Sequence, residues 1–432
     1  MKKRGLVLGG GGAKGSYEVG AIKALEACGY TFDCVSGTSI GALIGAIYAQ
    51  KDVERLVDFV YDLSPGMIVK NFFELPEDFE DLMDNKEEIL SFISNFIKTR
   101  SNDITPLIET FQRMFDYEKF ICSDVEYACM TYNVSKMVGQ PFYKKEFRQD
   151  LAISIIIASA SCFPAFPMME IEGEKFIDGG YAENVPISLV KEMQVDSLVV
   201  IDIRGPGRYV DYPKDPSMFL IEPLLPLGNF LDFRKEQGIR SLFLGYLETM
   251  KYLERYCGYL YTFDLDSLSR LDAWEEYAKT QFDHLHIHFE DDFVFKASSS
   301  ILGYEVKVVD TTYVRTHRYT ILLEALALCC GVDIVVLYSF DEFIHAVQKH
   351  LHSLDSFELP DTLKDIVSFI KETKKEDLLV FFHDILIKNQ ENLPAYYEPL
   401  AAVLDVTYRL SVLWILLDHY LCRDETVNRL EL

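Results

Sequence analysis

Short apolar runs alternate with stretches of helical periodicity along residues 5–205. The runs at residues 5–8 and 197–203 are almost entirely apolar, which is typical of strands buried on both faces of a parallel sheet. Residues 17–28 and 40–50 carry helical patterns between such runs. This alternation predicts an α/β fold with helices on both faces of the sheet.

Residues 64–120 interrupt this alternation with acidic sequence of helical pattern. Aromatic side chains recur there at roughly helical intervals, and such stripes usually pack on a core. We therefore favour an amphipathic cap helix over the alternative, a lid that covers a binding site. The aromatic residues of the stripe are Phe72, Phe73, Phe79, Phe92 and Phe96.

The chain changes character after residue 205. A stretch rich in glycine and proline follows, and from about residue 215 the pattern is mostly helical, with a short β-like passage at residues 285–309. We expect three parts: an α/β domain at 1–205, a helical extension packed on it at 206–280, and a mainly helical domain of unknown function at 281–432.

The most apolar C-terminal segment, residues 400–421, is interrupted by Asp405, Arg409 and Asp418. A membrane span needs ~20 apolar residues with few interruptions, so a buried bundle helix is favoured over an interfacial membrane helix. The apolar run after the basic start of the chain is too short for a signal peptide. We expect a cytoplasmic protein without a transmembrane helix.

The formal net charge is −26, from 42 Lys and Arg against 68 Asp and Glu. This charge argues against nucleic-acid binding and against electrostatic adsorption to anionic membranes. Any transient contact with a membrane surface must therefore rest on apolar side chains. The nine cysteines are scattered without a C-x-x-C pair, which agrees with a reducing compartment.

A G-T-S-I-G string at positions 37–41 follows an apolar run and precedes a helix rich in small residues. In a tight turn between a strand and a helix, small residues must flank a serine that projects its hydroxyl above the sheet edge. The helix N-terminus behind it favours developing negative charge. Ser39, flanked by Gly37 and Gly41, is the candidate nucleophile.

A serine nucleophile needs a proton acceptor, but all nine histidines lie between residues 284 and 419. A carboxylate within the α/β domain is the simpler base. Asp178 is the leading candidate because Gly179 and Gly180 follow it and permit the turn that presents a side chain into a cleft. Such a carboxylate is basic enough at neutral pH only in apolar surroundings. The competing aspartates are Asp33, Asp196 and Asp202.

A glycine run follows the first predicted strand, with the sequence G-G-G-G-A-K-G at positions 9–15. Its amides would suit an oxyanion hole, with the positive charge of Lys14 nearby. The same run matches G-x-G-x-x-G, with Asp33 at the distance of a ribose-binding acid, so a dinucleotide site is the competing interpretation. A Walker loop is excluded by the residues on either side of Lys14.

Four ordered elements together resemble the patatin-like phospholipases: G-G-G-x-K-G, G-T-S-x-G-A, a small-residue segment at 158–164, and D-G-G-x-x-x-N-x-P at 178–186. The resemblance covers residues 5 to about 205. The strings L-G-N-F-L-D-F at 227–233 and L-G-Y at 244–246 are also similar to an extension of some bacterial members. This resemblance implies a three-layer α/β/α fold with a mainly parallel sheet.

The resemblance also implies a chemistry. Ser39 would be the acylated nucleophile and Asp178 its base, without a metal or cofactor. The family acts on ester bonds of phospholipids or other acyl lipids without calcium, as phospholipase A or lysophospholipase. Glu183 departs from the neutral residue frequent in the family, and its acidity would act on the pKa of Asp178. The remaining motif residues are the oxyanion glycines Gly10, Gly11 and Gly12, with Lys14, Gly15, Gly37, Gly41, Gly179 and Gly180 in support.

Two alternatives stay open beside this hydrolase. The C-terminal half would bind a protein or membrane partner in an effector, or the glycine loop would bind a dinucleotide. His284, His286 and His288 would share one face of a strand, where a polar surface strand is favoured over a metal site. The sequence gives no indication of head group, acyl position or oligomeric state.

Overall fold

The computed structural model describes two compact units, Met1–Met250 and Lys251–Leu432, and each is considered by itself. The division of the chain at residues 205 and 280 stays a prediction. The described residues are 2–70, 103–212, 215–288, 290, 292–354 and 374–430.

The first unit is built on a sheet in which hydrogen-bonded neighbours follow the order β5-β6-β3-β2-β1-β7-β8, with β4 also paired to β3. Strands β1, β2, β3, β7 and β8 run parallel, whereas β4 and β6 are antiparallel to β3. The mainly parallel sheet is confirmed. The strands are β1 (Arg4–Leu8), β2 (Cys34–Thr38), β3 (Glu126–Asn133), β4 (Val138–Tyr143), β5 (Met169–Ile171), β6 (Glu174–Asp178), β7 (Ser197–Ile201) and β8 (Met218–Ile221).

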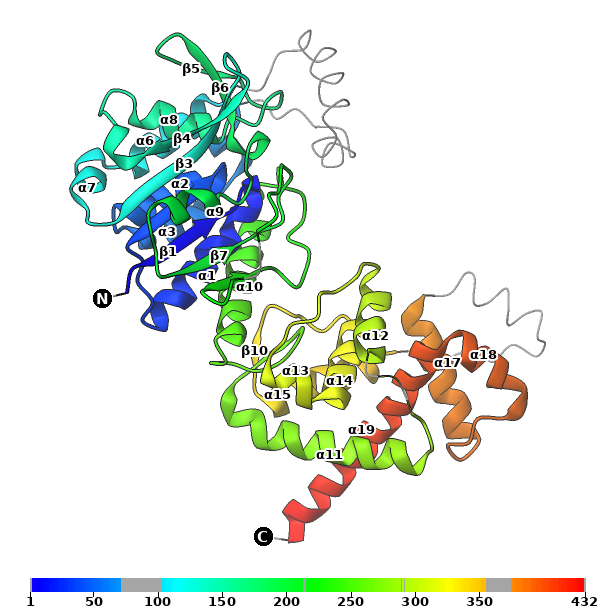
Figure 1. The fold of residues 1–432 in the computed structure, drawn as a ribbon. Helices are drawn as coiled ribbons and strands as arrows, with labels where there is room; N and C mark the ends of the chain where they lie inside the picture. The colour runs from blue at the N-terminus through cyan, green and yellow to red at the C-terminus, as the bar shows by residue number, and fades with distance from the viewer. Residues whose placement is uncertain are drawn as a thin grey trace. The chain divides into compact units, whose positions relative to one another are not determined.

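Helices cover both faces of this sheet (Figure 1). The predicted strands and helices around Ser39 are confirmed to within a few residues. The helices are α1 (Gly15–Ala27), α2 (Ile40–Ala49), α3 (Val53–Asp62), α6 (Thr105–Met114), α7 (Tyr117–Cys122), α8 (Ala152–Ser159), α9 (Ile187–Glu192) and α10 (Lys235–Tyr252).

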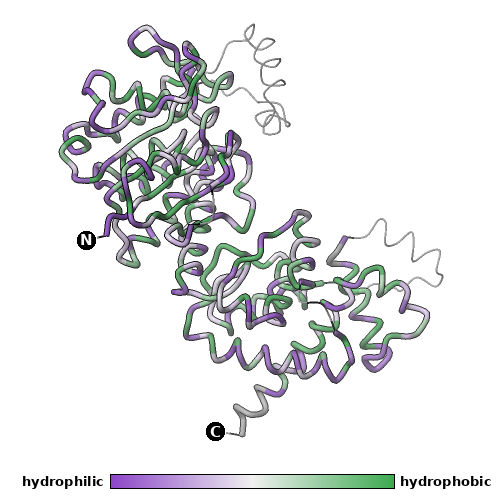
Figure 2. Tube along the Cα trace, viewed as in Figure 1, coloured by the Kyte–Doolittle hydropathy of each residue, from purple (hydrophilic) through white to green (hydrophobic). Residues whose placement is uncertain are grey.

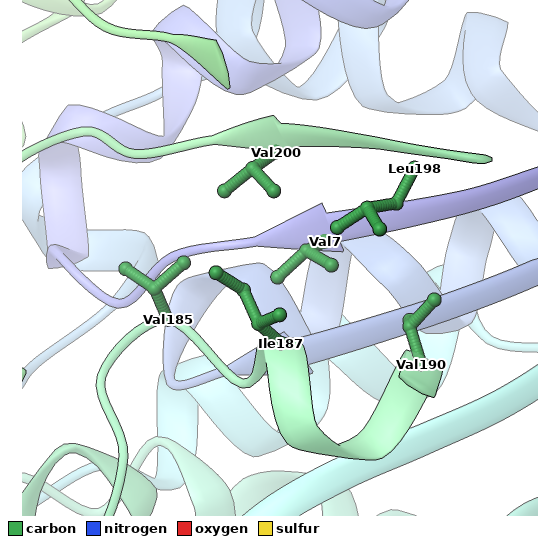
Figure 3. Packing of buried hydrophobic residues seen from close by; sticks show 6 residues of the cluster. All are labelled: Val7, Val185, Ile187, Val190, Leu198 and Val200. Atoms are coloured by element: carbon green, nitrogen blue, oxygen red, sulfur yellow. The ribbon is translucent and has the colours of Figure 1, made fainter. Parts of the chain in front are cut away.

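Successive residues of β1 point to opposite faces of the sheet, as the pleat requires. Val7 packs toward α9 in the cluster drawn in Figure 3. Leu8 faces α2, where a Cβ on Gly45 would lie 3.6 Å from its side chain. Full burial of each branched side chain contributes about 1.5–3 kcal/mol. The cluster comprises Val7, Val185, Ile187, Val190, Leu198 and Val200.

Two strands meet end to end beside β3. Strand β4 occupies one edge of β3 along residues 128–133. Strand β2 pairs with β3 as far as Thr38 opposite Met130, and β6 pairs with it at Asp178 opposite Thr131. Because a strand has only two edges, β2 and β6 share the second edge of β3. Their carboxyl ends therefore face each other at consecutive residues of β3.

The second unit is mainly helical, as the sequence pattern predicts (Figure 1). It contains one short parallel pair of strands, β9 and β10. Its elements are β9 (Thr262–Phe263), α11 (Leu268–His284), α12 (Phe293–Leu302), α13 (Thr312–Thr316), α14 (Arg318–Cys329), β10 (Leu337–Tyr338), α15 (Phe340–Leu351), α17 (Lys375–Lys388), α18 (Glu398–Val403) and α19 (Asp405–Leu430).

Helix α14 is the centre of the second unit, since nearly all its residues are buried. A helix that is buried on nearly every side must be surrounded by other elements. Helix α11 is amphipathic instead, and hydrophobic and hydrophilic residues alternate along it in Figure 2. It buries Leu271, Trp274, Ala278 and Phe282 at spacings of three and four residues. The ring of Trp274 meets Tyr420 of α19 edge to face at 5.4 Å.

Some expectations fail in this unit. The β-like passage is wrong: His284 ends α11 and His286 has a φ of 55° in the turn that follows, so the three imidazoles share no strand. Period-two polarity arose there from a helix end followed by a turn. The apolar C-terminal segment is divided at Leu404 into α18 and α19, but residues 410–417 of α19 are buried, as the favoured bundle helix requires.

Within the described ranges, no single helix has both the length and the apolar character that a membrane crossing requires. The segments Ala395–Val403 and Asp405–Arg423 meet that requirement only as a pair bent by 114°. The five phenylalanines of the predicted cap or lid lie outside the described residues. That prediction remains open.

A buried carboxylate, Glu324, holds the loop before β9. It accepts the N–H groups of Tyr259, Leu260 and Tyr261 at 2.6–3.2 Å, and the hydroxyl of Tyr313 at 3.1 Å. Burial raises the pKa of Glu324 to about 7, against the opposing effects of Lys251 and of these donors. The loop amides depend on this one side chain.

Replacing Glu324 with alanine should therefore destabilise the full chain by about 3 kcal/mol, because buried N–H groups would lose their acceptor. The measurement is the free energy of unfolding in denaturant. Glu254→Ala is the control, since Glu254 is exposed and its partner among the described residues is Thr312. Equal effects of the two substitutions would contradict the role of Glu324.

Candidate active site

Ser39 lies in the turn between β2 and α2, at the carboxyl edge of the sheet. Its backbone has φ 56° and ψ −127°, a conformation that a non-glycine residue adopts only at a cost of about 1–3 kcal/mol. The residue caps the N-terminus of α2, where the helix dipole favours negative charge on the serine oxygen. The predicted nucleophile elbow is present.

The flanking glycines of the elbow are required by close backbone contacts. A Cβ on Gly37 would lie 2.2 Å from the carbonyl oxygen of Gly41. A Cβ on Gly41 would lie 2.6 Å from the carbonyl oxygen of Leu8. A side chain at either position would clash with these backbone atoms and displace the turn that carries Ser39.

Asp178 ends β6 and reaches Ser39 across the point where β2 and β6 meet. Ser39 and Asp178 line the same cavity, and Ser39 lies near enough to lower the pKa of the Asp178 carboxyl. The N–H of Gly180 donates to Asp178 Oδ1 at 2.7 Å, and the N–H of Asp178 donates to the carbonyl of Ser161 at 2.9 Å. The structure thus brings together the two residues singled out by the motifs.

The pKa of Asp178 is raised to about 7, mainly because the side chain is buried, with an exposed fraction of 4%. The Gly180 N–H and the nearby Ser39 oppose this shift by stabilising the ionised form. A base is most effective when its pKa lies near the working pH. Asp178 therefore has the basicity that the sequence argument required.

The competing aspartates lie elsewhere or have other partners. Asp33 and Asp196 precede β2 and β7 and accept the N–H groups of Arg4 and Lys3, at the amino edge of the parallel strands. Asp202 follows β7 at the carboxyl edge but accepts from the Arg204 N–H at 2.8 Å. The position of Asp33 also argues against a dinucleotide site, because that site needs its acid at the carboxyl edge.

The glycines at positions 10–12 differ in whether their backbone N–H groups are already hydrogen-bonded. The N–H of Gly10 donates to the carbonyl of Asn184 at 2.9 Å, so this amide is already bound. The N–H groups of Gly11 and Gly12 have no acceptor within the described part of the chain, and both residues line the pocket that contains Ser39. We therefore restrict the proposed oxyanion donors to Gly11 and Gly12. Gly10 instead supports the loop.

Two charged residues near the motifs are held by other groups. The Nζ atom of buried Lys14 donates to the carbonyl of Arg204 at 3.2 Å. The carboxylate of Glu183 accepts the N–H of Ser188 at 3.1 Å and the hydroxyl of Tyr212. These contacts hold Glu183 at the start of α9.

Asn184 and the 227–233 segment received no role from the sequence. The Asn184 amide donates to the carbonyls of Gly10 and Gly205 at 3.2 Å each. The carbonyl of Phe230 accepts the Ala13 N–H at 2.7 Å and thereby braces the glycine loop. The N-x-P motif and the L-G-N-F-L-D-F string were the available signals, but neither indicates which loop it contacts.

Two adjoining cavities lie in this part of the unit. Ser39, Asp178, Gly11 and Gly12 line the first. The second is strongly apolar and extends between α1, α2, α3 and α6. Gly12 and Phe233 line both. The arrangement can therefore activate a hydroxyl, hold an oxyanion and accommodate an apolar chain beside it.

Residues 6–191 match the family model described as patatin-like phospholipase. The chain thus carries a patatin-like phospholipase domain, and the resemblance seen in the sequence is confirmed.

Curated relatives match over the same part of the chain. The lysophospholipase nte1 of Neurospora crassa is 32% identical over 206 residues, which is 47% of this chain and 12% of that protein. The lysophospholipase NTE1 of Saccharomyces cerevisiae is 30% identical over 216 residues, which is 48% of this chain and 11% of that protein. This chain therefore spans only about an eighth of the length of these relatives.

Among solved structures, VipD from Legionella pneumophila matches with a TM-score of 0.35 and 15% identity, over 97% of this chain and 91% of that one. The type III effector ExoU matches with a TM-score of 0.30 and 14% identity, over 89% and 80%.

The buried base predicts a pH dependence of Ser39 reactivity. If Asp178 is the base, it can accept the serine proton only when ionised, so modification of Ser39 by a serine-directed phosphonate should accelerate about tenfold per pH unit up to pH 7 and then level off. Labelling rates between pH 5 and 9 measure this. An inflection near pH ~4, the ordinary carboxyl value, would contradict the role of burial.

Proposed function

We propose that this chain is a serine lipid acyl hydrolase of the phospholipase A or lysophospholipase type, working through Ser39 and Asp178 without calcium. The observation that carries the proposal is the strained Ser39 at a strand–helix turn, which shares one cavity with the buried Asp178, a carboxyl whose pKa burial raises to about 7. The match to the patatin-like family and the names of the curated relatives support the same class of reaction.

The first half of the reaction forms an acyl enzyme. Ser39 Oγ attacks the ester carbonyl while its proton passes to Asp178. The N–H groups of Gly11 and Gly12 receive the oxyanion, and each such donor contributes about 3 kcal/mol to transition-state stabilisation in comparable sites. When the intermediate collapses, protonated Asp178 returns the proton to the departing alcohol.

The second half releases the acid. Water enters beside the acyl group and gives a proton to Asp178 as it attacks the acyl carbonyl. The same glycine amides hold the second oxyanion. Collapse then breaks the bond to Ser39 Oγ, which regains its proton from Asp178. Every proton transfer uses one carboxyl group, as expected for a pair without histidine.

The apolar cavity supports a long acyl chain as part of the substrate. Ile40, Leu43, Ile44 and Ile47 lie at successive turns of one face of α2 and line the cavity. Ile40 follows Ser39 in the sequence, and the lining continues along α2 for ~10 Å. Gly12 and Phe233 connect this cavity with the one that holds Ser39. The proposed substrates are phospholipids or other acyl-ester lipids, reached through transient apolar contact with a membrane surface.

The role of the second unit stays a prediction. An effector whose C-terminal half binds a partner is compatible with the same active site. A cytoplasmic location likewise remains an expectation from the sequence.

Removal of either partner should abolish fatty-acid release. Ser39→Ala removes the attacking oxygen and Asp178→Asn removes the base, so each should lower kcat by a factor on the order of 10⁴ or more while leaving the fold intact. Fatty acids released from mixed phospholipid vesicles are measured by mass spectrometry. Asp33→Asn, at the opposite edge of the sheet, is the control and should remain active. Activity of Ser39→Ala equal to wild type would refute the proposal.

Filling the far end of the apolar cavity should shorten the preferred acyl chain. Ile47→Trp adds a large side chain about two helical turns beyond Ser39, so kcat/KM for a palmitoyl ester should fall about 10- to 200-fold. The butyryl ester should react as in the wild type, and Ile47→Val should leave both activities nearly unchanged. Parallel losses for both esters would mean that the cavity does not hold the acyl chain.

A further inference from the structure

Ser159, the last residue of α8, lies behind the nucleophile and is fully buried. Its hydroxyl oxygen accepts the N–H of Ser39 at 3.1 Å. The same hydroxyl donates to the carbonyl of Met130 at 2.6 Å. No sequence motif assigned this residue a role, although it belongs to the small-residue segment before the base.

The two hydrogen bonds of Ser159 are complementary. A hydroxyl has one proton, and here that proton is directed to Met130, so a lone pair is left for Ser39. Met130 is the residue of β3 opposite Thr38, where β2 ends, and the next residue of β3 is opposite Asp178. Ser159 thus fills the junction at which the two reacting strand ends meet.

The same short segment also holds the base. The carbonyl of Ser161, two residues after Ser159, accepts the N–H of Asp178 at 2.9 Å. Residues 159–161 therefore contact the backbone of both partners of the pair. A shift of this segment would change the separation of Ser39 from Asp178.

We infer that Ser159 is a positioning residue that holds the strained backbone of Ser39 at the distance required for proton transfer to Asp178. The inference rests on the proposed function. It also explains why the oxyanion is left to the glycine loop, because the Ser39 N–H is already bound. Ser159 touches neither the reacting atoms nor the acyl chain, so it acts through Ser39.

Ser159→Ala tests this inference in the full-length chain. Losing the acceptor should release the Ser39 backbone and lower kcat about 10- to 100-fold, the size expected for a misplaced reacting group, with KM unchanged. The influence of Ser39 that lowers the pKa of Asp178 should weaken as well. The inflection in the pH profile of kcat/KM should therefore move to higher pH.

Ser36→Ala is the matched control. Ser36 is equally buried, lies on β2 and donates one hydrogen bond, to the carbonyl of Pro186 at 2.8 Å. It should lower the melting temperature without changing kcat or the pH inflection. Ser159→Thr keeps the hydroxyl and should recover most of kcat. Should Ser159→Ala fail to fold, Ser159→Cys fills the site with a weak acceptor and should show the same loss of kcat.

The outcomes separate the two proposals. If the wild type is active and the Ser159 variants match Ser36→Ala in kcat and in pH inflection, the role of Ser159 is overturned alone. If the wild type releases no fatty acid, the proposed function is overturned and the role of Ser159 with it.

Discussion

The placement of Ser39 beside Asp178 is the constraint on which the proposed chemistry of the N-terminal unit depends. It requires two residues 139 positions apart in sequence, at the ends of strands that run in opposite directions. The meeting of β2 and β6 on one edge of β3 supplies this geometry. The parallel strands bring Ser39, the proposed nucleophile, to the carboxyl edge, and the antiparallel return of β6 brings Asp178, the proposed base, back to it.

Burial of Asp178 has two opposing effects that the local structure balances. Taking a carboxylate out of water disfavours its charge and raises the pKa. The Gly180 N–H and the nearby Ser39 limit the rise, so that the value stays near 7. A fully solvated aspartate would be a poor base at that pH, and one without donors would remain protonated. Gly179 and Gly180 allow the tight turn after Asp178, and the Gly180 N–H thereby lies 2.7 Å from Asp178 Oδ1. This hydrogen bond limits the rise of the Asp178 pKa.

The sequence predicted what local patterns determine. The elbow around Ser39, the strands β1 and β7, and the aspartate before two glycines all follow from short strings whose geometry is local. The occupied amide of Gly10 could not be predicted, because its acceptor on Asn184 lies 174 residues away. Ser159 was missed for the same reason. The predicted strand with His284, His286 and His288 was wrong, because a helix end followed by a turn gave the same alternation of polar and apolar residues.

The apolar lining of the site relates the basicity of Asp178 to the kind of substrate that the site favours. A Ser-Asp pair without histidine works only if its surroundings exclude water, since solvation would return Asp178 to its ordinary acidity. Phe166, Phe230 and Leu231 line the cavity around the pair, and the larger cavity along α2 continues the same apolar surface. A bound substrate with an acyl chain would exclude the remaining water from the cavity around Asp178. A small polar ester would leave water in that cavity. The chemistry of the base therefore favours a lipid as the proposed substrate.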